Sequence, residues 1–251
     1  PDTTPWIIGA VEAVLVGYCL LGGGKRVIKA TSTLVPLMGV IYISVAFILT
    51  VMHINLVPGV VGRIFAEAFD FTAIFGGFAG SCMMFGIKRG LYSNEAGVGS
   101  APNAAAAADV SHPVKQGLVQ MLSVFIDTLL ICTATAFMCL SSGIEPTKEL
   151  AGAPYVQAAL AASMGDYAKL FITVSMVLFA FTTLLGNLYY VDNAFAYVLK
   201  HVPGKTFTLC YRILACVLIF IGAGSSMGTM WDLADVTMGF MAIINLPVIC
   251  I

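Results

Sequence analysis

The residues best placed for chemistry lie in "VLFAFTTLLGNLYY", residues 177–190, which is apolar enough to lie in lipid. Thr182, Thr183 and Asn187 nevertheless stand near its centre. At helical spacing the same face is completed by Phe179, Gly186 and Tyr190. The threonine hydroxyls could simply bond to carbonyls one turn earlier in their own helix. Two adjacent threonines a turn before an asparagine favour the other interpretation, in which this face binds something that crosses the membrane.

Three carboxylates are further candidates. Asp127, in "LSVFIDTLLICTATAF", is a candidate for proton binding or gating, although it could also be a protonated or hydrogen-bonded structural residue. Glu95, in "YSNEAG", has Lys88 and Arg89 within reach and is a candidate gating residue or an ordinary exposed ion pair. Glu12 lies nearer the end of its apolar segment, and we expect it to make a structural contact.

The elements that carry these residues are set by composition. Of the 251 residues, 59% are hydrophobic and 10% are charged, whereas soluble domains are about one-quarter charged. A net charge of −1 gives no reason to expect nucleic acid. The chain is therefore expected to be an all-α membrane protein in a lipid bilayer.

About seven segments are long enough to cross a hydrocarbon core, for which roughly 20 apolar residues suffice. They are expected at about 6–22, 31–52, 66–87, 116–142, 168–198, 206–224 and 229–251. The cations fall unequally on the two sides: one side holds Lys25, Arg26, Lys29, Lys88, Arg89, Lys115, Lys200, Lys205 and Arg212, and the other holds Arg63, Lys148 and Lys169. The positive-inside rule places the larger group in the cytoplasm.

The third segment has a glycine cluster in its middle, at Gly76, Gly77 and Gly80. Glycine costs about 1 kcal/mol in a helix interior, so the cluster indicates either a functional break or close helix packing through a small-xxx-small pair. Motifs of soluble enzymes do not explain the chain. "GSSMG", residues 224–228, matches GxSxG but joins two apolar helices, and no HExxH or GxGxxG occurs. We therefore do not expect an enzyme.

One long stretch resembles a known family. "GIKRGLYSNEAGVGSAPNAAAAADVSHPVKQGLVQM", residues 86–121, is similar to the "SNEAG-x-GS-[AT]-PNAAAAA" region of the sodium:alanine symporter family, also called the alanine or glycine:cation symporters. "SVFIDTLLICTATAF", "LFAFTTLLGN" and "WDLADVTMGFMAIINL" resemble later parts of that family. The resemblance covers essentially the whole chain.

The resemblance implies a fold similar to the leucine transporter, with two inverted repeats of five helices around a site at the membrane midplane. On this basis the chain is expected to be a single transmembrane domain and a fragment covering the fourth to tenth core helices. Residues 1–60 would end the first repeat, and residues 61–251 would form the second.

By the same resemblance, the glycine cluster is expected to be an unwound part of the substrate site, with backbone groups of Gly76, Gly77 and Phe78 exposed to the ligand. The sodium site is expected at the hydroxyls of Thr182 and Thr183 with the carbonyl of Phe179. Thr183 would also border the substrate, together with Asn187. Some members carry tryptophan at the position of Asn187, so asparagine leaves room for a larger substrate.

The function that the resemblance implies is secondary active transport. We expect inward Na⁺ flow to drive symport of a small neutral amino acid, such as alanine or glycine, by alternating access across a cell membrane. Na⁺ is the coupling ion, and no other cofactor is expected. The alternatives are H⁺ coupling through Asp127, a preference for glutamine and, in another class, a channel or a non-transporting membrane subunit.

Overall fold

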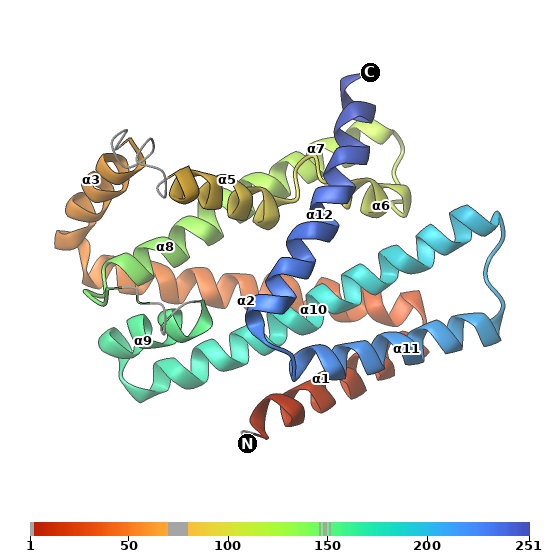
Figure 1. The fold of residues 1–251 in the computed structure, drawn as a ribbon, viewed down its shortest axis with the longest axis horizontal. Coiled ribbons are helices and arrows are strands. Elements are labelled where there is room, and N and C mark those ends of the chain that lie inside the picture. The colour runs from red at the N-terminus through yellow and green to blue at the C-terminus, as the bar shows by residue number, and fades with distance from the viewer. Residues whose placement is uncertain (1–2, 70–79, 146, 148–149, 151) are drawn as a thin grey trace. The chain divides into compact units, whose positions relative to one another are not determined.

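The computed structural model describes residues 3–69, 80–145, 147, 150 and 152–251, and their regular structure is entirely helical (Figure 1). Six candidate membrane spans occur in this part of the chain. They are α1 (Thr4–Leu21), α2 (Gly24–Met52), the continuous run Pro113–Leu140, α10 (Asp166–Leu199), α11 (Lys205–Ala223) and α12 (Met227–Cys250). The run Pro113–Leu140 consists of α7 (Pro113–Phe125), a π-helical segment η2 (Ile126–Cys132) and α8 (Thr133–Leu140). The expected all-α class and six of the seven expected spans are confirmed.

The remaining elements are shorter: η1 (Ile54–Leu56), α3 (Val57–Ala68), α5 (Gly80–Asn94), α6 (Ala101–Ala106) and α9 (Ala153–Met164). The third expected span, residues 66–87, includes positions outside the described residues, and α3 and α5 flank those positions. The second expected span begins too late, because α2 starts at Gly24 rather than at residue 31. Hydropathy locates only the apolar part of that helix, whereas the helix itself continues through Lys25, Arg26 and Lys29.

The chain divides into two compact units. The first contains Pro1–Leu37, Gly97–Gly117 and Val177–Ile251, and the second contains Met38–Ala96 and Leu118–Met176.

In the first unit, α1 packs along α11, and small residues let the two helices approach closely (Figure 1). A Cβ atom added at Gly9 would collide with the Cβ of Ala223, and one at Gly17 would lie 3.3 Å from the Sγ of Cys216. The ring of Trp6 lies on α11 as well, with its centroid 5.1 Å from that of Phe220. The pairing of α1 with α11 therefore depends on glycine at two positions of α1.

A buried set of side chains, which we name the α1–α10 cluster, joins α1, α2 and α10. Its members are Val16, Cys19, Leu20, Val27, Phe181 and Leu185. Arg212 of α11 adds a polar junction at the end of α1: its guanidinium donates to the carbonyl of Leu20 at 2.6 Å and to the carboxylate of Asp192 at 2.8 Å. These contacts fix the part of α10 that carries the predicted site.

In the second unit, polar contacts tie the helices together. The hydroxyls of Tyr42 on α2 and Thr135 on α8 lie 2.8 Å apart. Arg63 of α3 makes two ion pairs. Its Nε lies 2.7 Å from Oε1 of Glu67, and its Nη1 lies 3.0 Å from Oε1 of Glu145 in the segment after α8. The hydrogen bonds and charge of Arg63 lower the pKa of the Glu145 carboxyl below its ordinary value. The two ion pairs of Arg63, which we name the Arg63 clip, therefore link α3 to the chain that follows α8.

Candidate functional site

A hollow of about 380 Å³ lies in the first unit, beside the middle of α10. We name it the threonine hollow. Its lining comes from the beginning of α2 (Val27, Ile28, Thr31, Val35), from α6 and the two residues near its end (Ala104, Ala107, Ala108), and from α10 (Thr182, Gly186, Tyr189, Tyr190). Three residues of the predicted face of α10 line this hollow: Thr182, Gly186 and Tyr190. Their four-residue spacing places them on one side of the helix.

Thr182 is 7% exposed and lies midway along α10. Its hydroxyl donates to the carbonyls of Leu178 at 3.0 Å and Phe179 at 3.1 Å. These are the bonds within its own helix that the sequence left open as an alternative. A hydroxyl has one proton but two acceptor lone pairs, so this donation still leaves the oxygen able to accept from, or coordinate, a ligand.

Thr31 supplies a second hydroxyl to the same hollow, from a different helix. Its Oγ1 donates to the carbonyls of Val27 at 3.0 Å and Ile28 at 3.2 Å. Both threonine protons are therefore held by their own helices, while both oxygens remain potential ligands. Neutral oxygens of this kind are what a hard cation prefers.

The threonine hollow stays open because glycine and alanine form part of its lining. Apart from its chain neighbours and the backbone of its own helix, a Cβ atom added at Gly186 would meet no heavy atom within 4 Å. In the same lining, the wall contributed by Ala104, Ala107 and Ala108 has only methyl side chains. Small residues on two sides therefore keep the hollow open.

The alanine wall is held in place by a glycine loop that packs on α12. The backbone of Gly97 has φ +80° and that of Gly99 has φ +112°, conformations that favour glycine. The side-chain amide of Asn245 on α12 donates to the carbonyl of Gly97 at 2.9 Å. A Cβ atom at Gly99 would lie 3.1 Å from that of Asn245. Glycine is thus required here both by conformation and by close approach.

The other predicted residues are distributed differently. Thr183 and Asn187 are exposed on the described chain and do not line the threonine hollow. Phe179 is half-buried, and its carbonyl accepts from Thr182. Gly76, Gly77 and Phe78 lie outside the described residues, so the predicted backbone site stays a prediction.

Asp127 belongs to the second unit, in the π-helical segment η2. Its carboxylate accepts a hydrogen bond of 2.7 Å from the hydroxyl of Ser93 on α5, and the same hydroxyl lies 3.1 Å from the Sγ of Cys132. Segments with i→i+5 hydrogen bonds are rare and are frequently found at functional sites. Asp127 is thus a half-buried carboxylate with a donor.

Glu95 directly follows α5 and adopts a left-handed backbone with φ 54°. It is half-buried, and the next amide, that of Ala96, donates to the side chain of Asn94 at 2.9 Å. Its proposed pairing with Lys88 or Arg89 stays a prediction. Within the described ranges, no three His, Cys, Asp or Glu side chains gather as a metal site.

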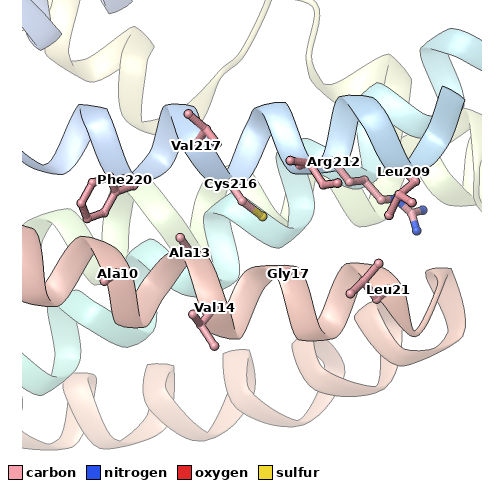
Figure 2. Close-up of a pocket in the computed structure, with 11 residues that line it drawn as sticks. Ala10, Ala13, Val14, Gly17, Leu21, Leu209, Arg212, Cys216, Val217 and Phe220 are labelled. Carbon is pink, nitrogen blue, oxygen red and sulfur yellow. The ribbon is translucent and has the colours of Figure 1, made fainter. Parts of the chain in front are cut away.

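A second hollow, of about 460 Å³, lies between α1 and α11 (Figure 2). Ala10, Ala13 and Gly17 of α1 line it opposite Cys216 and Phe220 of α11. Its lining has one charged group, Arg212, which is already hydrogen-bonded to its neighbours. It is larger than the threonine hollow but lacks its oxygen ligands.

The model of the "Sodium:alanine symporter family" matches residues 2–251. The chain belongs to this family. The helices and hollow described above are therefore those of a sodium:alanine symporter family member.

Relatives of this family member include several amino-acid carriers. It is 42% identical over 245 residues to the "Amino-acid carrier protein AlsT" of Bacillus subtilis, covering 98% of this chain and 52% of the relative. To the "Probable sodium/glutamine symporter GlnT" of Bacillus subtilis it is 41% identical over 239 residues, covering 95% and 49%. To the "Sodium/alanine symporter AgcS" of Methanococcus maripaludis it is 40% identical over 245 residues, covering 96% and 53%. The chain thus spans about half the length of these relatives.

Sequence reasoning missed two parts of the site in this family member. Thr31 stood at the start of the expected span 31–52 and was given no role, because threonine has many structural uses near the ends of a helix. Asn245 lies within an apolar run, and its type and spacing gave it no role of its own. The alanine run did carry a signal, because its lack of bulky side chains is compatible with close packing against neighbouring helices or with movement as part of an inner gate.

Proposed function

We propose that this protein is a secondary active transporter, or part of one, that couples inward Na⁺ flow to uptake of a small neutral amino acid. Alanine and glycine are the proposed substrates, alternating access is the proposed mechanism, and the plasma membrane is the proposed location. Support comes from the names of the relatives, which include a sodium/alanine symporter and a probable sodium/glutamine symporter. These names describe the relatives; the experiment below tests the activity in this protein.

One observation carries the proposal: Thr182 is buried midway along a membrane-spanning helix and still lines an open hollow. A buried hydroxyl in lipid needs no such space if its only task is to satisfy its own helix. With its proton donated internally, Thr182 presents lone pairs to the hollow. This is the arrangement that a dehydrated cation requires.

In the proposed sodium site, Thr182 and Thr183 coordinate through their hydroxyls and Phe179 through its carbonyl. Thr183, Asn187 and the backbone of Gly76, Gly77 and Phe78 contact the substrate. Participation of Thr183 requires that its exposed face on the described chain be covered when the site is complete. The proposed architecture is the leucine-transporter-like arrangement, with residues 61–251 forming the second inverted repeat.

Two variants of the proposal follow from particular features. Asn187 is smaller than tryptophan, which supports a substrate as large as glutamine, and one relative is named for glutamine. Another relative is named "Sodium/proton-dependent alanine carrier protein", which supports a contribution from H⁺. A channel, by contrast, would conduct without saturable substrate-driven uptake.

The deciding experiment is uptake of labelled neutral amino acids by the full-length protein in proteoliposomes, with and without a Na⁺ gradient. Removing the Thr182 hydroxyl by Thr182→Val keeps the shape and deletes one ligand. A hydrogen bond to a charged group is worth about 1.5–3 kcal/mol, which serves as a proxy for one ion–oxygen contact. The apparent Na⁺ affinity should therefore fall about 10- to 100-fold, whereas Thr182→Ser should have a mild effect.

The matched control is Thr237→Val on α12. The Thr237 hydroxyl also donates to two carbonyls of its own helix, at 3.0 Å and 2.9 Å, but its side chain is exposed and lies away from the hollow. This variant should keep wild-type Na⁺ dependence. Equal behaviour of Thr182→Val and Thr237→Val would place the sodium site elsewhere, and the absence of Na⁺-driven uptake in the wild type would reject the proposed function itself.

A further inference from the structure

Glu12 has an unusual position for a carboxylic acid. It is the ninth of the eighteen residues of α1, a candidate membrane span, and is 5% exposed. Both carboxylate oxygens are buried, and neither has a hydrogen-bond partner among the residues that the structure describes. The sequence placed Glu12 nearer the end of its apolar segment, whereas in the structure it lies at the middle of α1, because α1 begins at Thr4.

The surroundings of Glu12 are apolar. The buried face of α1 contains Gly9, Glu12 and Val16, and Val16 belongs to the α1–α10 cluster with Phe181. Glu12 precedes Val16 by four residues, so its side chain lies on the same face, one turn away from that cluster. Phe181 directly precedes Thr182, which links the Glu12 region to the wall of the threonine hollow.

Among the described residues, no charged or titratable group on α1, α2, α10 or α11 forms a hydrogen bond with the Glu12 carboxyl. These groups are Tyr18 and Cys19 on α1; Lys25, Arg26, Lys29 and Tyr42 on α2; Asp166, Tyr167, Lys169, Tyr189, Tyr190, Asp192 and Tyr197 on α10; and Lys205, Cys210, Tyr211, Arg212 and Cys216 on α11. Arg212 binds Asp192 and the carbonyl of Leu20. Arg26 donates to the carbonyl of Tyr18 at 3.1 Å. Within the described chain, no cation compensates the charge of an ionised Glu12.

A carboxylate sealed in apolar surroundings without donors is costly by several kcal/mol, whereas the neutral acid costs much less. Asp127 differs, because it is half-buried and accepts a hydrogen bond of 2.7 Å from Ser93. The burial of Glu12 without a hydrogen-bond donor among the described residues therefore favours its neutral, protonated form. The sequence named Asp127 as a candidate for proton binding, and that candidate stays a prediction beside Glu12.

We propose that Glu12 is a proton-binding site of the transporter. The carboxyl is protonated when α1 and α10 are packed as in this structure. When that packing opens to water, the O–H bond breaks, the proton passes to water and a carboxylate remains. Because Phe181 joins the cluster to the wall of the hollow, proton occupancy at Glu12 and Na⁺ occupancy at Thr182 are linked reciprocally. This inference rests on the proposed function, which it deepens by naming H⁺ as a second ligand.

The transport test compares three variants of the full-length protein in proteoliposomes, at saturating Na⁺, from acidic to alkaline pH. The protonated fraction of a carboxyl falls about tenfold for each pH unit above its midpoint, and wild-type uptake should fall with it. Glu12→Gln mimics the neutral acid and should transport with less than a twofold change over the same range. Glu12→Asp should retain pH dependence, and Asp127→Asn should keep the wild-type profile.

A second measurement does not depend on transport. Ionising Glu12 opposes the packed state, so the thermal midpoint of the purified wild-type protein should fall as pH rises. Glu12→Gln and Glu12→Leu should both lack this fall, and the apolar leucine variant covers the case in which the glutamine variant does not fold. If the wild type shows no uptake but the midpoints behave as expected, the proposed function fails while the proton site stands.

Three results would overturn the inference. The first is a wild-type pH profile of uptake in Glu12→Gln. The second is a parallel fall in midpoint with pH for the wild type and both neutral variants. The third is a Glu12→Gln protein whose apparent Na⁺ affinity is weakened equally at every pH with its pH profile unchanged, since the carboxylate would then bind Na⁺ rather than a proton.

Discussion

The junction at Arg212 allows a quantitative prediction about stability. Its guanidinium ties α11 to α10 through Asp192 and to the end of α1 through the carbonyl of Leu20. The side chains of Arg212 and Asp192 are 15% and 24% exposed, so the pair is largely removed from water. Breaking a buried pair by removing one partner costs about 3–5 kcal/mol. With this residual exposure, we expect Arg212→Leu to cost about 3 kcal/mol.

For a chain of this size, each kcal/mol shifts the unfolding midpoint by about 2–4 °C, so Arg212→Leu should lower it by about 6–12 °C. Arg212→Lys should give an intermediate loss, because an ammonium group cannot make the planar two-sided contact. The assay is thermal unfolding of the purified protein in detergent. Lys169→Ala is the control, since its pair with Asp166 is 63% and 96% exposed and is worth at most about 1 kcal/mol. If Arg212→Leu and Lys169→Ala had the same midpoint, the junction would not stabilise the fold.

Three further predictions concern substrate size, the glycine loop and pH. Asn187→Trp should restrict transport to alanine and glycine, and an unchanged uptake profile across neutral amino acids would remove Asn187 from the site. Gly99→Ala should cost about 1–2 kcal/mol, because an alanine disfavours φ > 0 and its Cβ crowds Asn245; a thermal midpoint equal to that of the wild type would contradict this. The lowered pKa of Glu145 means that its pairing with Arg63 stabilises above the ordinary carboxyl range and is lost as pH falls through the lowered value. Arg63→Gln should therefore make the thermal midpoint less sensitive to acid, and parallel acid sensitivity of the two proteins would show that the clip contributes nothing.

The membrane spans could be predicted from the sequence because burial in lipid is a local property of a segment. Six of the expected spans appear as helices, since roughly 20 apolar residues cross the membrane wherever they occur. The short helix α9 was not predicted, although the sequence carries signals for both of its ends. Pro154 in its first turn and Gly165 at its end, with φ +69°, are ordinary helix start and stop signals. These signals were overlooked because the segments were chosen by hydropathy alone.

The sequence also predicted which residues share one side of α10, but not which of them line the hollow. Helical spacing placed Thr182, Gly186 and Tyr190 together, and the structure gives them a common hollow. It also separates Thr183 and Asn187, which are exposed on the described chain. Spacing along one helix says which residues share a side; it does not say which neighbour covers each part of that side.

The tertiary structure alone decided which groups have partners. Thr31 and Thr182 line the same hollow, although 151 positions separate them in the sequence, and no periodic pattern relates them. The same holds for two of the carboxyls within spans: Asp127 accepts a hydrogen bond from Ser93 on another helix, and Glu12 has no donor among the described residues. Hydropathy treats both acids alike because it counts only their own polarity. Their protonation depends on the dipoles and charges that distant segments bring to them, and those are set by packing.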